Sequence, residues 1–221
     1  DIPTSNFVYL NSYERAKKFY LNEVNVKDTV IKYDGLAKGK GVFLPDTIEE
    51  SRSIVKNYFA RQESNECGII VEGRLYGTEV SVLAFCNGKE AYLMPQAQDY
   101  KRIYDGDKGA NTGGMGAICP ANILTTEELK KVKNHMDKVV KKLSYRGVLY
   151  AGLMKSKNGG IYFLEFNCRF GDPETQVILN LLDGNLLDVM KKCIEREDLS
   201  LRWKKSCAAT VVLSHVDYPE K

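Results

Sequence analysis

The sequence contains few histidines and no pair of cysteines with the spacing of metal ligands. Only His135 and His215 occur among 221 residues, whereas a Ser-His-Asp or Cys-His triad requires a well-placed histidine. Both suit ordinary core or surface positions, since His135 lies inside an expected helix and His215 just after an expected strand. The six cysteines are scattered without a C-x-x-C pair, so neither a zinc site nor a disulfide framework is indicated. Chemistry must therefore rest on Lys, Arg, Asp, Glu and a metal ion.

Long hydrophobic runs and an excess of one charge are also missing. No apolar stretch approaches the ~20 residues of a membrane-spanning helix, and the first residues show no signal-peptide pattern. The 32 Lys and Arg against 29 Asp and Glu give a net charge of +3, which is too balanced to indicate binding to nucleic acid or to a membrane surface. Because scattered cysteines suit a reducing compartment, we expect a soluble, cytoplasmic protein with neither partner. The small positive excess can still serve an anionic small molecule.

Composition and periodicity predict an α+β fold. Hydrophobic residues make up 43% of the chain and charged residues 28%, as in ordinary globular proteins of one larger or two smaller domains. Mixed helices and strands come first, and a mostly antiparallel sheet with helices follows. Two of the helices begin at capping boxes, Thr47 with Glu50 and Thr125 with Glu128. The expected helices start near residues 12 and 47 and cover 125–143, 174–182 and 185–196, and the expected strands cover 29–33, 42–44, 68–73, 79–85, 90–95, 147–154, 160–167 and 208–213.

A polar, glycine-rich segment at residues 96–116 is expected to be a long loop. It has almost no aliphatic residues and ends in the run TGGMG. Such a loop in a compact domain is usually functional or disordered, and its glycines could fold around a phosphate or cover a site. A solvated, mobile loop is the alternative. The charged and amide residues of the loop are Asp99, Lys101, Arg102, Asp105, Asp107, Lys108 and Asn111, alongside Gly113, Gly114 and Gly116.

The strand GIYFLEFN carries the sharpest local pattern. Alternation predicts that Ile161, Phe163, Glu165 and Asn167 share one face. A carboxylate and an amide oxygen then lie side by side, and hard oxygen ligands of this kind suit Mg²⁺ that carries a nucleotide phosphate. A salt bridge between Glu165 and Arg169 is the alternative, because a buried carboxylate needs a cation.

Two lysines accompany a glycine-rich turn near the start of the chain. Lys32 lies in a strand directly before the turn DGLAKGKG, and Lys40 lies within it. Backbone of this kind can approach oxyanions closely, and ammonium groups neutralise phosphate. The turn is not a P-loop, since Val42 follows Gly41 and the spacing fails. Further along, Asp172 and Glu174 flank a proline at a helix start, which by itself is ordinary helix chemistry.

Taken in order, several segments resemble the phosphoribosylamine–glycine ligase (glycinamide ribonucleotide synthetase) family of the ATP-grasp superfamily. They extend from residue 2 to about residue 176 and continue in a final block, and they are IPT, KYDGLAKGKGV, ESNECGIIVEGRLYGTEVS, QDYKRIYDGDKGANTGGMGA, LYAGLM, EFNCRFGDPETQ and VVLSHVDYP. The resemblance implies two α/β subdomains that clasp ATP, a small one at 1–71 and a large one at 72–203, with 204–221 beginning a C-terminal domain. It also implies ATP-dependent ligation of glycine to 5-phosphoribosylamine through a glycyl phosphate, in purine biosynthesis.

The resemblance also implies roles for individual residues. Lys32 and Lys40 would hold ATP phosphates, Glu72, Gly73 and Leu75 would lie at the hinge that reads adenine, and Glu79 would meet the ribose. Glu165 and Asn167 would bind Mg²⁺ or Mn²⁺. Arg169, Lys40 and Asp172 would be the catalytic residues, with Arg169 steadying the transferring phosphoryl group. Asp99, Lys101, Asn111, Gly113, Gly114 and Asp172 would lie near glycine and the phosphoribosyl amine.

In the family a further domain precedes IPT and another follows VVLSHVDYP. We therefore expect an ATP-grasp core whose ligase activity is impaired or absent when these residues stand alone, with other domains of a multifunctional purine-synthesis polypeptide as candidate partners. Two alternatives remain open. One is a non-catalytic module that binds Mg-ATP, and the other is an ATP-grasp ligase for a different carboxylate and amine.

Overall fold

The computed structural model describes residues 1–20, 25–35, 41–60 and 67–219. The chain forms two compact units, Thr4–Tyr76 and a larger one made of Asp1–Pro3 with Gly77–Lys221. All pairings between the named strands of the described residues are antiparallel, as the α+β prediction requires. The sequence-based boundary after residue 71 falls inside a strand of the smaller unit, and the structure divides five residues later, after Tyr76.

The smaller unit is a four-stranded sheet with two helices. The strand order is β1-β4-β2-β3. Its elements are β1 (Phe7–Leu10), α1 (Tyr13–Phe19), a 3₁₀ turn η1 (Val26–Asp28), β2 (Thr29–Tyr33), β3 (Val42–Phe43), α2 (Ile48–Ala60) and β4 (Ile69–Gly73). One core joins Ala16 and Tyr20 on and beside α1 to Val55 and Tyr58 of α2 and to Ile31 of β2. The predicted strand at 29–33 is confirmed as β2, and the one predicted at 68–73 is confirmed as β4 from Ile69 onward.

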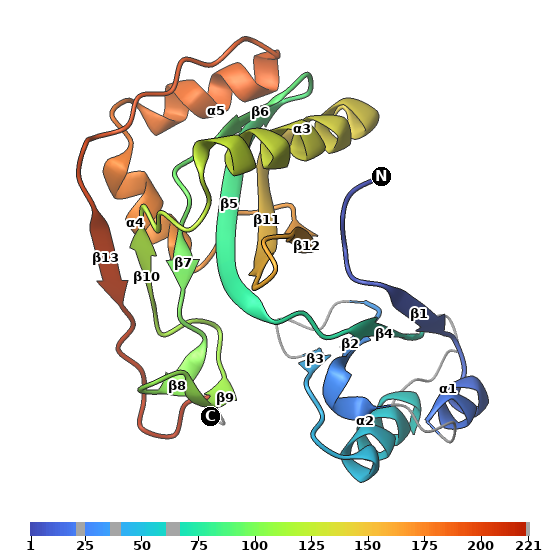
Figure 1. Cartoon of the computed structure of the whole chain (residues 1–221). Helices are drawn as coiled ribbons and strands as arrows, with labels where there is room; N and C mark the ends of the chain where they lie inside the picture. The colour runs from blue at the N-terminus through green and yellow to red at the C-terminus, as the bar shows by residue number, and fades with distance from the viewer. Residues whose placement is uncertain (21–24, 36–40, 61–66, 220–221) are drawn as a thin grey trace. The chain divides into compact units, whose positions relative to one another are not determined.

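The larger unit is built around a second four-stranded sheet, ordered β12-β11-β5-β6. A three-stranded sheet, β13-β10-β7, and a small hairpin, β8-β9, complete its strands (Figure 1). The strands are β5 (Gly77–Asn87), β6 (Ala91–Leu93), β7 (Gln98–Asp99), β8 (Arg102–Tyr104), β9 (Lys108–Asn111), β10 (Gly116–Cys119), β11 (Arg146–Ser156), β12 (Ile161–Asn167) and β13 (Ala208–Val211). The helices are α3 (Thr126–Leu143), α4 (Glu174–Ile178) with a 3₁₀ turn η2 (Leu179–Leu181), and α5 (Leu186–Glu195).

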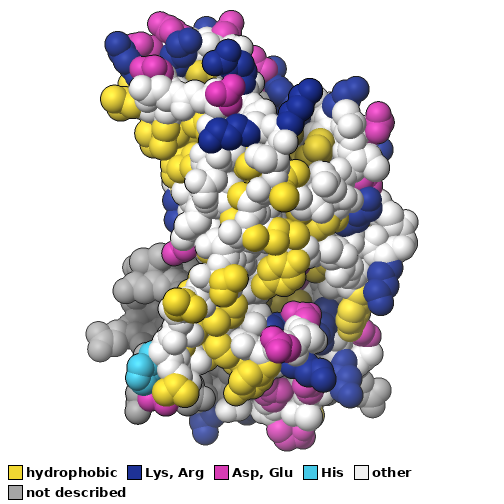
Figure 2. Space-filling view, turned by 90° about the vertical axis from the view of Figure 1, so that its left-hand side faces the viewer, with side chains coloured by type: hydrophobic (Ala, Val, Ile, Leu, Met, Phe, Trp, Pro, Cys, Tyr) yellow, Lys and Arg dark blue, Asp and Glu magenta, His cyan; other side chains and the backbone are white. Residues whose placement is uncertain are grey.

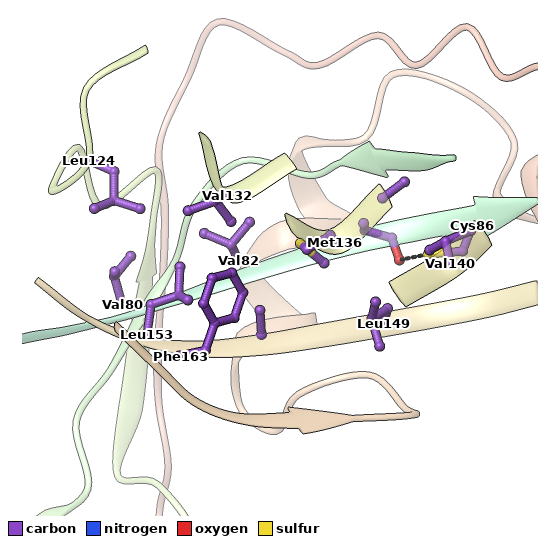
Figure 3. Packing of buried hydrophobic residues seen from close by; sticks show 13 residues of the cluster. Val80, Val82, Cys86, Leu124, Val132, Met136, Val140, Leu149, Leu153 and Phe163 are labelled. Carbon is purple, nitrogen blue, oxygen red and sulfur yellow. Dashed lines mark hydrogen bonds between the residues drawn. The ribbon is translucent and has the colours of Figure 1, made fainter. Parts of the chain in front are cut away.

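Helix α3 covers one face of this sheet. Its residues Val132, Met136 and Val140 are buried against Val82 of β5 and Leu149 of β11 (Figure 3). Thr125 begins the helix with a complete capping box, since its side chain accepts from the Glu128 amide and the Glu128 carboxylate accepts from the Thr125 amide. The apolar face predicted for residues 125–143 is therefore the core face, except that Leu143 at the helix end is exposed.

The opposite face of the sheet packs against α4, α5 and the three-stranded sheet. Leu83, Phe85 and Tyr150 contribute from the sheet, Val177 from α4 and Cys193 from α5. Layers therefore cover both faces of the central sheet, and its two long strands β5 and β11 are buried along most of their length. This arrangement places polar side chains of the β5–β11–β12 surface under α4 and β7.

Two local expectations differ from the structure. The segment 96–116 is not an irregular loop, because it forms β7, β8 and β9, with the hairpin turn at Gly106 and Asp107 in positive-φ conformations. An exposed polar hairpin needs no apolar alternation, so the periodicity could not reveal it. At α2, Thr47 caps the Glu50 amide as predicted, but the Glu50 carboxylate accepts from the amide of Asp46 and not of Thr47.

On the β13 side of the larger unit, hydrophobic side chains gather in a band among charges of both signs (Figure 2). Exposed hydrophobic residues in and after β13 are Val211, Leu213 and Val216. In the part of the chain that the structure describes, every helix is too short or too polar to cross a membrane.

Candidate functional site

A bulge in β12 decides where the candidate metal ligands point. Gly152 of β11 opposes Glu165 and Leu153 opposes Phe163, so Leu164 is one extra residue of β12 relative to β11. Phe163 and Phe166 consequently both join the core under α3, with ring centroids 5.2 Å apart. The prediction that Glu165 and Asn167 share a face with Phe163 is wrong, because a bulge reverses the alternation beyond it.

Beyond the bulge, Glu165 and Asn167 lie on the sheet face that packs against α4. Their cross-strand partners are Gly152 and Tyr150, and Gly152 in turn opposes Ser81 of β5. The Asn167 amide donates to Glu165 Oε1 at 2.8 Å. Two adjacent side chains with hard oxygen atoms suit a divalent cation such as Mg²⁺. No group of three or more His, Cys, Asp or Glu arranged to hold a metal occurs among the residues placed in the structure, so phosphate oxygens or water would have to complete the ligand shell.

The salt bridge from Glu165 to Arg169, which was the alternative to a metal site, does not form in the structure as far as it is described. The Arg169 guanidinium donates to the carbonyl oxygen of Phe170 at 2.8 Å, and both Arg169 and Glu165 are exposed. Asp172, three residues further on, is also exposed and accepts from Gln176 at 2.8 Å. The segment between β12 and α4 therefore presents a cation and a carboxylate to solvent.

A cluster of opposite charges lies on the same sheet face. Lys101 Nζ is 2.9 Å from Glu79 Oε2 and 3.6 Å from Asp99 Oδ2. Burial raises the pKa of Asp99 to about 6, against the opposing effect of Lys101 and with support from the charges of Glu174 and Glu79. Burial lowers the pKa of Lys101, but the nearby carboxylates of Asp99, Glu79 and Glu165 raise it by more. The net shift of the Lys101 pKa is therefore upward. Lys101 is thus held as an ammonium among carboxylates.

The glycine run 112–116 packs against two distant segments. Gly114 has φ +127 and lies so close to Pro173 that a Cβ would come within 2.4 Å of its ring. The Gly113 amide donates to the phenol oxygen of Tyr218 at 2.9 Å. The Gly114 amide donates to Thr112 Oγ1 at 3.0 Å. Asn111, by contrast, is an exposed residue of β9 opposite Arg102.

In the smaller unit, two of the predicted nucleotide residues form an ion pair. Lys32 Nζ of β2 lies 2.7 Å from Glu72 Oε2 of β4, and both side chains are mostly buried. Gly73 follows at the end of β4, where its carbonyl accepts from Ser5 Oγ at 2.6 Å. Leu75 is half-buried just beyond. Lys40 lies outside the described residues.

The sequence patterns missed a buried polar group beside this cluster. Ser81, Tyr150 and Glu174 come from β5, β11 and α4 and are 2%, 7% and 2% exposed. Ser81 Oγ donates to Glu174 Oε1 at 2.8 Å and lies 2.9 Å from the Tyr150 hydroxyl. In the sequence, Ser81 and Tyr150 were visible only as a serine and a tyrosine within mostly apolar strand segments. Glu174 was interpreted only as an ordinary acidic residue at the start of a helix.

The fold is shared with solved structures of a ligase and a synthetase. The crystal structure of phosphoribosylamine–glycine ligase from Thermotoga maritima matches with a TM-score of 0.86 and 33% identity, covering 99% of this chain and 57% of that one. The N5-carboxyaminoimidazole ribonucleotide synthetase of Thermus thermophilus matches with a TM-score of 0.70 at 18% identity over 95% of this chain, a likeness of fold alone. These similarities and the order of the elements define an ATP-grasp domain.

The family follows from the sequence match. The family model for the phosphoribosylglycinamide synthetase ATP-grasp (A) domain matches residues 1–175, and the chain belongs to this family. It is 41% identical over 229 residues to a phosphoribosylamine–glycine ligase of Leptospira interrogans, covering 99% of this chain and 53% of the relative. It is also 41% identical to a trifunctional purine biosynthetic protein of Drosophila melanogaster, covering 17% of that relative. The chain thus spans about half the length of the single-activity relatives.

Proposed function

We propose that the chain is the ATP-grasp core of a phosphoribosylamine–glycine ligase. The reaction consumes ATP, glycine and 5-phosphoribosylamine and yields glycinamide ribonucleotide, ADP and phosphate. The observation that carries this assignment is the single sheet face on which Glu165 and Asn167 lie beside the Lys101–Glu79–Asp99 cluster. The family match over residues 1–175 supports the same activity.

The chemistry requires two anions to meet. A glycine carboxylate oxygen attacks the γ-phosphorus as ADP leaves, and the amine nitrogen then attacks the acyl carbon, loses its proton and expels phosphate. No protein nucleophile is needed, so catalysis consists of positioning and charge neutralisation. When bound, Mg²⁺ or Mn²⁺ would neutralise charge on the polyphosphate.

Each site residue has a role in this proposal. Glu165 and Asn167 supply hard oxygen atoms to the cation, and Arg169 steadies the transferring phosphoryl group. Lys32, oriented by Glu72 at 2.7 Å, and Lys40 neutralise phosphates. The remaining candidates fall into two sets. The residues assigned to ATP binding are Glu72, Gly73, Leu75 and Glu79. The residues assigned to the surroundings of glycine and the phosphoribosyl amine are Asp99, Lys101, Asn111, Gly113, Gly114 and Asp172.

We place the protein in the cytoplasm, within or beside other purine-synthesis domains. All six cysteines are free, which suits a reducing compartment. The Drosophila melanogaster relative is named as a trifunctional purine biosynthetic protein, and relatives of this kind motivate the assignment of other domains as partners.

The test uses the full-length polypeptide that contains these residues. ADP release should require glycine and 5-phosphoribosylamine together. Turnover with another carboxylate and amine from a substrate panel would indicate a ligase of different specificity. Binding of Mg-ATP without turnover on any pair would indicate a non-catalytic module.

Glu165→Gln should reduce kcat by ~10²-fold or more, because it removes the charged ligand of the cation that neutralises the reacting phosphates. The change keeps the size of the side chain, and titration calorimetry should show a weaker dependence of ATP binding on Mg²⁺. Glu49→Gln in the first turn of α2 is the matched control and should leave both quantities unchanged. Normal turnover of the Glu165 variant would overturn its assigned role.

A further inference from the structure

Glu174 is a buried carboxylate that the proposed reaction does not use. It lies at the start of α4 and is 2% exposed. Burying a charge is costly unless hydrogen bonds compensate, and here Ser81 Oγ supplies one at 2.8 Å. Since a serine has one hydroxyl proton, the Tyr150 hydroxyl at 2.9 Å must donate to Ser81. The result is an ordered relay from Tyr150 through Ser81 to Glu174.

The Tyr150 hydroxyl, at the start of this hydrogen-bonded chain, is buried. Burial raises the pKa of Tyr150, and the charges of Glu174 and Asp99 raise it further. Tyr150 also opposes Asn167 across the β11–β12 ladder. The carboxylate of Glu174 is therefore connected, through two hydroxyls, to the strand beside the candidate metal ligands.

The chain immediately before Glu174 is wrapped around its carboxylate. A Cβ at Gly171 would lie 2.5 Å from Glu174 Oε2 and 3.0 Å from the Tyr150 ring, so a larger residue there would have to displace the buried carboxylate. The Thr175 amide donates to the Gly171 carbonyl at 3.2 Å. The segment 168–173, which carries Arg169 and Asp172, is thus fixed at one end by the β12 ladder and at the other by Glu174.

We propose that Glu174 is a positioning residue that anchors the segment 168–173, and so orients Arg169 and Asp172, by hydrogen-bonding to Ser81 and through it to Tyr150. The inference rests on the proposed function, since it assumes that these two side chains act on the substrates. Glu174 touches no substrate in this account. Ser81 is part of the same positioning interaction, because it donates the hydrogen bond that the Glu174 carboxylate accepts.

The test compares steady-state kinetics of the full-length polypeptide with ATP, glycine and 5-phosphoribosylamine. Glu174→Ala and Ser81→Ala should each lower kcat by about 10-fold to 100-fold, as supporting residues of such sites typically do, with KM for ATP changed less than about 3-fold. Because each removes the same hydrogen bond, the double variant should be no worse than the poorer single variant. Glu174→Gln, which keeps the acceptor for Ser81, should restore kcat to within about 3-fold of the original.

Several outcomes would overturn the inference. Variants with normal kcat and only a lower melting temperature would show a purely structural role. A Glu174→Gln variant as impaired as Glu174→Ala would show that charge, and not position, matters. If Glu174→Ala does not fold, Ser81→Ala decides the question alone. Ser51→Ala in α2 is the matched control, since Ser51 is fully buried and donates to the Thr47 carbonyl at 3.2 Å, and it should lower stability without lowering kcat. An unaltered polypeptide without ligase activity would instead refute the proposed function.

Discussion

Single residues show how local exceptions create the site. Leu164, an apolar residue with no obvious role, is the extra residue that sends Glu165 and Asn167 to the face opposite Phe163. Ser81 and Tyr150 interrupt otherwise apolar strands and meet over the one carboxylate of α4. At this scale, the arrangement of the candidate site depends on side chains that break the periodic pattern of their strand.

Asp99 should make the stability of the protein depend on pH. Its pKa is raised to about 6 in the folded state, so the folded protein binds this proton more tightly than the unfolded chain does. The contribution of Asp99 to the stability of the folded state therefore becomes more favourable by about 1 kcal/mol as the pH falls from 7.5 to 5. The free energy of unfolding of the wild type and of Asp99→Asn can be measured by urea unfolding at both pH values. The difference between the two proteins should change with pH by this amount, because the other titrating groups contribute equally to both. A difference that does not vary with pH, or that varies in the opposite sense, would contradict the burial of an ionisable Asp99.

Short elements position the glycine run. Gly116 begins β10, which pairs with β13, and the chain after β13 returns so that Tyr218 accepts from the Gly113 amide. The residues that flank the run are also fixed, since the Met115 amide donates to the Tyr100 carbonyl at 2.7 Å. The glycine run is therefore held at its C-terminal end by the backbone hydrogen bonds of β10 and, at Gly113, by the hydroxyl of Tyr218.

Tyr218→Phe should loosen this run without disturbing the sheets. The change removes only the acceptor of the Gly113 amide, and one such hydrogen bond contributes about 1 kcal/mol. Hydrogen exchange of the amides at 113–115 should therefore accelerate by roughly 5-fold, while amides of β5 and β11 keep their rates. Tyr104→Phe, an exposed tyrosine of β8, is the control. Equal exchange in Tyr218→Phe and the unaltered protein would show that the phenol does not hold the run.

At the scale of the whole molecule, the chain contains separate cores. The smaller unit has one, around Ile31, Tyr20 and Val55, and the larger unit has one on each face of its central sheet. The boundary at Tyr76 follows from this division of packing. Substitutions in one unit should therefore affect its stability first.

Met136→Ala should destabilise the larger unit by about 3 kcal/mol, since the buried side chain leaves a cavity under α3. Hydrogen exchange should accelerate in β5 and β11, against which α3 packs, and less in β2 and β4. Val55→Ala, which truncates the core of the smaller unit, is the reciprocal variant and should show the opposite distribution. Equal acceleration in both units from either change would indicate that the chain unfolds as one unit.

The sequence by itself determined the class of fold, the family resemblance and most elements. Apolar periodicity located α3, because burial of one face repeats along it, and short apolar runs located β2, β11 and β12. The motifs also supplied the candidate residues, and the structure brings Lys32 to Glu72, Lys101 to Asp99 and Glu79, and Asn167 to Glu165.

Only the tertiary structure decided which faces these residues occupy and what supports them. Strict alternation could not reveal the bulge at Leu164, which brings both Phe163 and Phe166 under α3. Local patterns could not join Ser81 to Glu174, which lie 93 positions apart, or Gly113 to Tyr218. Such contacts depend on how sheets and helices pack, and residues distant in sequence leave no periodic signal when they meet.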